Sequence, residues 1–246
     1  MTTEIVFSSG EFQKLLYYSN NEFKTIGSWH KKNVVIITAG RAATQIIDIL
    51  SYDSSVRVVG CLDDGNPPFY CQDFNIPVVG KISDMKSLFG QGKFSHAIVG
   101  ISTSINLRKK FFDLCAENNV PTINAIHPSC TICKKVKFGT GNVICADVHI
   151  GTLAEIGDNN FISAKCNFEH HNKIGSHNTF GPCVVTSGIV EIGNESKFGT
   201  GIFTEPFLKI GSNCIIGSSN VIIDSIKDNM ILRTKIGSMP QERKIG

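Results

Sequence analysis

Two adjacent histidines behind a glutamate are the residues of this chain best suited to acid–base chemistry. They are Glu169, His170 and His171, in the segment FEHHNKIG (168–175) of a chain that has seven histidines. A histidine beside a carboxylate can act as a general base, because the carboxylate fixes the ring tautomer and raises its basicity. The same residue types are also compatible with a polar turn that has no function. The backbone that carries them decides between these readings.

Metal binding is a further reading of histidines in this half of the chain, as in the gamma-class carbonic anhydrases. Such a site needs three histidines at set offsets, and the available ones do not repeat in that way: His149, His170, His171 and His177. Cys130 and Cys133 form a C-x-x-C without the second pair that a zinc site requires. We therefore expect no metal, and reduced cysteines that mostly fill the core.

A six-residue period organises the second half of the chain. Of seventeen positions at this spacing, fifteen are Ile or Phe and two are Thr, and the register runs without an insertion. The positions are Ile126, Ile132, Phe138, Ile144, Ile150, Ile156, Ile162, Phe168, Ile174, Phe180, Thr186, Ile192, Phe198, Thr204, Ile210, Ile216 and Ile222. A sustained hexapeptide repeat is typical of a parallel β-helix, which is left-handed in the known hexapeptide cases.

This frame predicts where each side chain lies. Three hexads close one triangular coil, so the repeat forms about six coils with the leading Ile or Phe inside. Glycine often follows the leading residue, either to relieve crowding or to allow positive φ. Because side chains alternate along a strand, His170 and His171 should face different directions.

The first half alternates apolar strands with helical segments. Strands are expected at 33–40, 56–64 and 94–101, and helices at 41–52 and 104–119, with Ser104 as the cap of the latter. This order predicts a small Rossmann-like parallel α/β domain at 33–125, followed by the β-helix and its C-terminal tail at 126–246. Residues 1–32 form an extension of unassigned role, in which 11–19 is compatible with a helix.

Ligands of open parallel sheets bind at the carboxyl ends of the strands. That edge is expected to carry Thr38, Ala39, Gly40, Asp63, Asp64 and Gly100. The amides that open the 41–52 helix could hold a phosphate, and an aspartate could accept bonds from a base or ribose. The dinucleotide fingerprint G-x-G-x-x-G is absent, so NAD binding is disfavoured. A tight turn and a polar loop without a ligand are the alternative.

Composition excludes several classes of function. The net charge of +3 and the lack of a basic, aromatic-rich run argue against nucleic-acid binding. The hydrophobic content of 41% and charged content of 18% are those of a globular protein. There is neither a signal-peptide pattern nor an apolar stretch of about 20 residues, so we expect a cytoplasmic protein without a membrane span.

The combination of an α/β domain and an uninterrupted hexapeptide helix resembles the bacterial sugar acyltransferases. These include nucleotide-linked amino-sugar N-acetyltransferases and the sialic acid O-acetyltransferase group. The resemblance covers residues 33 to about 240. It rests on CLDD (61–64), AIVGI to LRKK (97–110), IHPSC (126–130), EHHNKIG (169–175) and TSGIVEIG (186–193).

The resemblance implies a role for each matching residue. His170 would be the catalytic base, with Glu169 as its orienting partner, and the N–H of Gly188 would hold the thioester carbonyl. Gly199, Gly217 and Ser218 would line the coenzyme A arm, and the 38–43 turn with Asp63 and Asp64 would bind the nucleotide. Family members are homotrimers with active sites between subunits. The implied reaction is acetyl-CoA-dependent N-acetylation of a dTDP- or UDP-linked amino-deoxy sugar for lipopolysaccharide or capsule biosynthesis.

Some positions depart from the family pattern. Ala42, Ser163 and Thr179 stand where the family often has histidine, asparagine and histidine, and GSMPQERK (237–244) replaces a G-x-P-A-K motif. Two alternatives therefore remain: O-acetylation of a sialic acid or another sugar, and a catalytically silent trimer that binds a nucleotide sugar. Cys166 is the cysteine nearest to His170 in sequence and is expected to fill the core rather than act as a nucleophile.

Overall fold

The computed structural model describes residues 5–7, 14–19, 22–28, 31–65 and 74–234. Its first strands form an antiparallel sheet in the order β1-β2-β3, with β1 at Ile5–Phe7, β2 at Lys14–Ser19 and β3 at Glu22–Ser28. The helix considered for 11–19 is therefore wrong over 14–19, whereas 11–13 lie outside the described residues. The segment KLLYYS suits a strand because tyrosine has high β propensity, and it pairs with β3 along most of its length.

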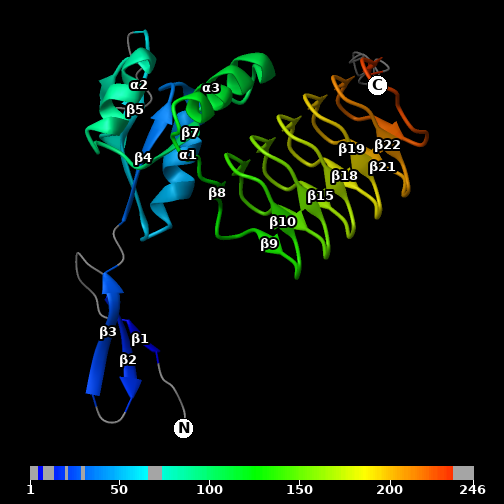
Figure 1. The fold of residues 1–246 in the computed structure, drawn as a ribbon. Coiled ribbons are helices and arrows are strands. Elements are labelled where there is room, and N and C mark those ends of the chain that lie inside the picture. The colour runs from blue at the N-terminus through cyan, green and yellow to red at the C-terminus, as the bar shows by residue number, and fades with distance from the viewer. Residues whose placement is uncertain (1–4, 8–13, 20–21, 29–30, 66–73, 235–246) are drawn as a thin grey trace, which may run out of the picture.

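A four-stranded parallel sheet in the order β6-β5-β4-β7 follows (Figure 1). The strands are β4 (Lys32–Ile37), β5 (Val56–Leu62), β6 (Val78–Gly80) and β7 (His96–Val99). The helices are α1 (Arg41–Ser51), the 3-10 turn η2 (Ile82–Asp84), α2 (Met85–Gly90) and α3 (Ile105–Glu117). The three expected strands and two expected helices are present, and Ser104 caps α3 by accepting from the N–H of Leu107 at 3.4 Å. The sequence reading missed β6 and α2.

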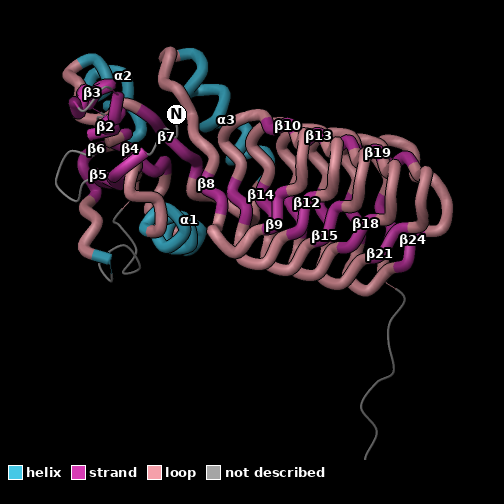
Figure 2. Tube along the Cα trace, turned by 90° about the horizontal axis from the view of Figure 1, so that it is seen from below, coloured by secondary structure: helices cyan, strands magenta, loops and turns pink. Residues whose placement is uncertain are grey.

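The rest of the described chain is a prism of three parallel sheets, whose stacked strands fit a left-handed β-helix (Figure 2). The first sheet contains β10 (Lys137–Phe138), β13 (Glu155–Ile156), β16 (Lys173–Ile174), β19 (Glu191–Ile192) and β22 (Lys209–Ile210). The second contains β8 (Ala125–Ile126), β11 (Val143–Ile144), β14 (Phe161–Ile162), β17 (Thr179–Phe180), β20 (Lys197–Phe198), β23 (Ile215–Ile216) and β25 (Ile231–Leu232). The third contains β9 (Thr131–Ile132), β12 (His149–Ile150), β15 (Asn167–Phe168), β18 (Val185–Thr186), β21 (Phe203–Thr204) and β24 (Val221–Ile222).

The hexad frame matches this architecture position by position. Each leading residue from Ile126 to Ile222 is the second residue of a two-residue strand, and Ile156 and Ile162 are buried. Inside the prism the rings of Phe168 and Phe180 meet edge to face at 5.0 Å between centroids, and Phe180 stacks on Phe198 at 4.8 Å. Close packing of this narrow core makes the inward positions intolerant of polar side chains.

The glycine that follows the leading residue of a hexad relieves crowding between the coils. It does not supply the positive φ of the turn. A Cβ on Gly157 would lie 2.8 Å from the backbone carbon of Gly175 in the next coil. The positive φ of the turn is found two residues after this glycine position in the hexad. It lies mostly on residues other than glycine, such as Leu153, His171 and Ile189. Of the two roles expected for these glycines, close approach is therefore the one that the structure supports.

The α/β sheet packs against the first coils of the β-helix. The core formed by β4 and α1 includes Val143 of β11 and Phe161 of β14, so one hydrophobic cluster joins the two parts. In Figure 1 the helices of the α/β part lie at the end of the β-helix where its coils begin. The last coils extend away from this contact.

Candidate functional site

The histidine doublet lies at one edge of the β-helix, which we call the histidine corner. It comprises the turns that follow β12, β15 and β18, at residues 151–154, 169–172 and 187–190. His170 and Gly188 are one coil apart there. A Cβ on Gly188 would lie 2.7 Å from Nε2 and 2.6 Å from Cε1 of the His170 ring. The structure therefore brings together two residues that the sequence assigned to one site, with the imidazole lying over the glycine.

The two histidines meet rather than diverge. Their Nδ1 atoms are 3.0 Å apart, and their rings stand at 88° with centroids separated by 5.2 Å. The expectation that they face different directions is wrong, because β15 ends at Phe168 and strand alternation ends with it. His171 has φ of 60°, which turns its side chain toward His170. Within the described residues the Glu169 carboxylate forms no hydrogen bond with either ring.

The backbone of Gly188 offers a donor at the same place. Its carbonyl accepts from the N–H of Phe207 at 3.2 Å, whereas its own N–H has no hydrogen-bond partner in the described part of the chain. Gly188 is half-buried. An unused amide beside an imidazole can stabilise negative charge on an oxygen bound between them.

The residues expected to line a coenzyme A arm lie at another edge of the prism. Gly199 and Gly217 follow β20 and β23, at the corner between the second and third sheets. Ser218 Oγ accepts from the N–H of Thr200 at 3.1 Å, and a Cβ on Gly199 would lie 2.6 Å from the Ser218 nitrogen. These three residues are neighbours of one another, but one strand of the third sheet separates their corner from the histidine corner.

The strand ends of the α/β part gather as expected. Thr38, with φ of 76°, donates from Oγ1 to the carbonyl of Gly100 at 3.0 Å. Gly100 has no room for a side chain, since a Cβ would lie 2.9 Å from Cγ2 of Ile36. Gly40 occupies the N-cap position of α1 and provides no side-chain cap. The carboxyl ends of β4, β5 and β7 therefore form one edge.

Both aspartates at this edge accept hydrogen bonds from backbone N–H groups of nearby loops. The Asp63 carboxylate accepts from the N–H of Ala39 at 2.7 Å and from that of Gly65 at 2.8 Å. Asp64 accepts from the N–H of Ile82 at 2.9 Å. Their first role is to fix the turn after β4 and the loop after β5, and any contact with a base or ribose would use the remaining lone pairs.

Arg108 on α3 joins the α/β part to the β-helix, and the sequence reading did not assign it this role. Its side chain is 1% exposed, and all five of its N–H groups are used. The acceptors are Oγ1 of Thr179 and the carbonyls of Ile101, Asn159, His177 and Asn178, at 2.8 to 3.2 Å. Burial lowers the pKa of Arg108 to about 10, so the guanidinium stays charged at neutral pH. Thr179 therefore has a structural role as an acceptor of Arg108.

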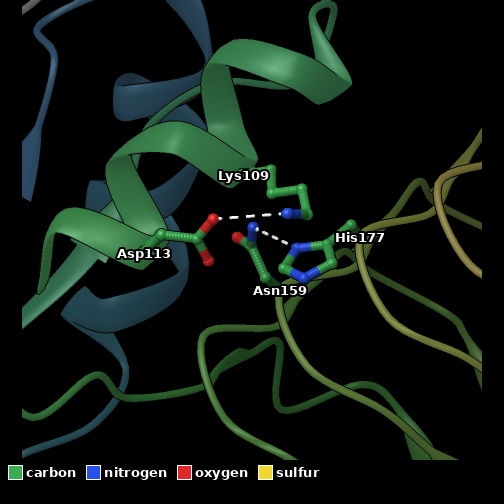
Figure 3. Close-up of polar contacts among 4 residues, drawn as sticks. All are labelled: Lys109, Asp113, Asn159 and His177. Carbon is green, nitrogen blue, oxygen red and sulfur yellow. Dashed lines mark hydrogen bonds and ion pairs between the residues drawn. The ribbon is translucent and has the colours of Figure 1, made fainter. Parts of the chain in front are cut away.

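A second polar contact at the same interface involves His177 (Figure 3). Asn159 Nδ2 lies 2.9 Å from Nδ1 of His177, and the ring of Phe112 meets His177 edge to face. Beside them, Lys109 and Asp113 form an ion pair of 3.3 Å on α3. Burial, and then the charge of Lys109, lower the pKa of His177, so the surroundings favour the neutral imidazole.

Cys166 and Cys145 do not offer a nucleophile at the histidine corner. Cys166 is buried and its pKa is raised to about 12, chiefly by burial, so at neutral pH it is a thiol. Burial also raises the pKa of Cys145, to about 11. Across the described ranges no group of three or more His, Cys, Asp or Glu side chains is placed to hold a metal ion. None of the helices described is long and apolar enough to span a membrane.

The fold and the site together define a class: a parallel α/β unit that precedes a hexapeptide β-helix with a histidine at a coil corner. Several solved structures are similar to this chain in fold, among them PerB, the acetyltransferase domain of PglB, and WeeI. PerB from Caulobacter crescentus, in complex with CoA and GDP-perosamine, is 27% identical, with a TM-score of 0.75 over 85% of this chain and 95% of that one. The acetyltransferase domain of PglB from Neisseria gonorrhoeae, in complex with acetyl coenzyme A, is 21% identical, with a TM-score of 0.74 over 83% and 97%. WeeI from Acinetobacter baumannii is 17% identical, with a TM-score of 0.59 over 81% and 95%.

The likeness to PerB confirms the resemblance to hexapeptide-repeat sugar acyltransferases that the sequence motifs indicated. No family model matches the chain, and no curated protein does. The likenesses to PglB and WeeI are at low identity and show the fold alone.

Proposed function

We propose that this chain is an acetyl-CoA-dependent acetyltransferase that N-acetylates the amino group of a nucleotide-linked amino-deoxy sugar, in the biosynthesis of a surface glycan. The observation that carries the proposal is the placement of the His170 ring over Gly188, next to an unused backbone N–H. PerB, a neighbour in fold at 27% identity, has CoA and GDP-perosamine bound.

The proposed reaction is direct acyl transfer. Nε2 of His170 takes a proton from the sugar amine as the nitrogen forms a bond with the thioester carbonyl carbon. The N–H of Gly188 donates to the oxygen that becomes negative, the carbon–sulfur bond then breaks, and the proton ends on the sulfur of coenzyme A. General-base help contributes about 10²- to 10⁴-fold, and one oxyanion donor about 3 kcal/mol. The neighbouring Glu169 carboxylate favours the imidazolium that forms.

Assembly into a homotrimer would complete the site. In one subunit Gly199, Gly217 and Ser218 lie one edge away from His170, so we propose that this corner of an adjacent subunit lines the coenzyme A arm. At the histidine corner Ile189 is 40% exposed, and in the turn of the next coil, after β21, Phe207 is 70% exposed. Contiguous exposed apolar side chains of this kind mark a protein contact.

The nucleotide portion of the acceptor is assigned to the Rossmann-like domain at 33–125, along the edge formed by Thr38, Ala39, Gly40 and Gly100. Asp63 and Asp64 shape this edge through their bonds to loop amides. The sequence led us to expect a dTDP- or UDP-linked sugar, and the ligand of PerB adds a GDP-linked one to the set worth testing.

Acetyl-CoA consumption measured against dTDP-, UDP- and GDP-linked 4-amino sugars, with free sialic acids alongside, tests the proposal. Turnover with one of the nucleotide-linked amines is the expected result. Turnover with a sialic acid alone would replace N-acetylation by O-acetylation. Binding of a nucleotide sugar without any turnover would contradict the enzymatic role and support the silent binding protein.

A further inference from the structure

The contact between the two histidines restricts their protonation. With Nδ1 atoms 3.0 Å apart, one nitrogen must carry the hydrogen and the other must accept it. Two neutral arrangements satisfy this condition. Either His170 donates from Nδ1 and keeps a bare Nε2, or His171 donates and the hydrogen of His170 resides on Nε2.

Only the first arrangement makes His170 a base on the side where chemistry is proposed. Nε2 is the ring nitrogen nearer to Gly188, at 2.7 Å from the position of a Cβ there, against 3.3 Å for Nδ1. A bare Nε2 can take a proton at that place, and a protonated Nε2 of a neutral ring cannot. The state of Nδ1 therefore controls the reactivity of Nε2.

We propose that His171 is the positioning residue of His170: its Nδ1 accepts the hydrogen of His170 Nδ1, selects the tautomer with a bare Nε2, and stabilises the imidazolium formed when Nε2 takes a proton. This inference rests on the proposed function. It assigns to His171 the hydrogen-bonding role that the sequence analysis gave to Glu169. Glu169 then contributes through its negative charge.

The backbone around His171 does not require a histidine. The same position of successive coils carries Lys135, Leu153, His171, Ile189 and Phe207, all with φ between 59° and 65°. The N–H of His171 donates to the carbonyl of Thr152, and the N–H of Ile189 to that of His170, both at 3.0 Å. These bonds form whatever the side chain is. A leucine is thus compatible with the turn, and among the described residues the imidazole ring makes its polar contact with His170.

Two substitutions separate positioning from structure. His171→Leu copies Leu153 and removes the acceptor, whereas His171→Asn keeps an acceptor oxygen in a residue that adopts positive φ readily. We expect kcat to fall about 10- to 100-fold in His171→Leu, with the KM for acetyl-CoA unchanged, and to recover largely in His171→Asn. Lys135→Leu makes the same kind of change two coils away and should leave kcat unchanged. Equal kcat in wild type and His171→Leu, or equal losses in both His171 variants, would overturn the inference.

A measurement without turnover reads the tautomer directly. In protein labelled with ¹⁵N-histidine, long-range ¹H–¹⁵N spectra distinguish a ring protonated on Nδ1 from one protonated on Nε2. We expect His170 to carry its hydrogen on Nδ1 in the wild type and to shift toward Nε2 in His171→Leu. A wild-type His170 protonated on Nε2 would contradict the inference even where acetyl transfer is found. Absence of transfer together with an Nδ1-protonated His170 would contradict the proposed reaction but not the contact.

Discussion

The imidazole of His170 lies against Gly188 so closely that any side chain at position 188 would collide with it, at 2.6 to 2.7 Å from Cε1 and Nε2. Gly188→Ala should therefore displace the ring. The added methyl group meets only the end of a side chain, so the fold should be retained. We expect kcat to fall by about 10² or more with an unchanged melting temperature. Gly90→Ala is the control, because a Cβ there meets nothing within 4 Å. Full activity of Gly188→Ala would show that the contact is not needed.

Shortening an inward-facing side chain of the hexad frame should destabilise the β-helix. Ile162 is fully buried, so Ile162→Ala should lower the free energy of unfolding by about 2 to 5 kcal/mol through loss of packing and cavity formation. Ile223→Ala, at a side chain that is 66% exposed, should change the free energy of unfolding little. Urea denaturation compares the two variants. Equal stability would contradict the assignment of inward positions.

Replacement of Arg108 should loosen the contact between α3 and the β-helix. Arg108→Met removes a donor from Thr179 and from four carbonyls, which should cost at least about 3 kcal/mol. The measurement is hydrogen exchange in α3, which should accelerate in this variant and not in Lys110→Met, an exposed position of the same helix. Unchanged protection of α3 would show that the hydrophobic cluster alone joins the two parts.

Stability should decline in weak acid because of His177. Burial and the charge of Lys109 lower its folded-state pKa from 6.5, whereas the unfolded chain binds the proton near 6.5. As pH falls through this value the unfolded state gains a proton that the folded state does not, so the free energy of unfolding decreases until the lowered pKa is reached.

Urea midpoints at about pH 7.5 and pH 5.5 compare the stability above and below the pKa of histidine in the unfolded chain. The decrease between them should be smaller in His177→Asn, which has no titrating group and suits the positive φ of 64° at this position. The pKa of His96 is also lowered by burial, so part of the decrease should remain. An identical decrease in wild type and His177→Asn would contradict the role of His177.

The β-helix could be predicted from the sequence because its signal is local and repeated. Each hexad places one apolar residue, such as Ile144 or Phe180, in the same core, so errors at single positions do not disturb the frame. The internal ladder in which Asn142, Asn160 and Asn178 bond from coil to coil was not recognised, although its spacing of eighteen residues is visible in the sequence.

The site was predicted only in part, because its geometry depends on turns and on contacts that are distant in sequence. The spacing of His170 and Gly188, one coil apart, followed from the motif and the period. The direction of the His171 ring depends on a positive φ that no residue type announces. Arg108 contacts Thr179, 71 residues away, and could not be assigned before α3 was placed on the β-helix.

The most direct test of the account is the turnover of His170→Ala with an acceptor that the wild type acetylates. Loss of the general base should lower kcat by at least about 10² while the KM for acetyl-CoA stays nearly constant, because the ring is assigned to the reaction and not to the coenzyme A arm. Glu169→Ala should cost less, since only the influence of its charge is lost. Equal kcat in wild type and His170→Ala would contradict the assignment of this corner as the active site.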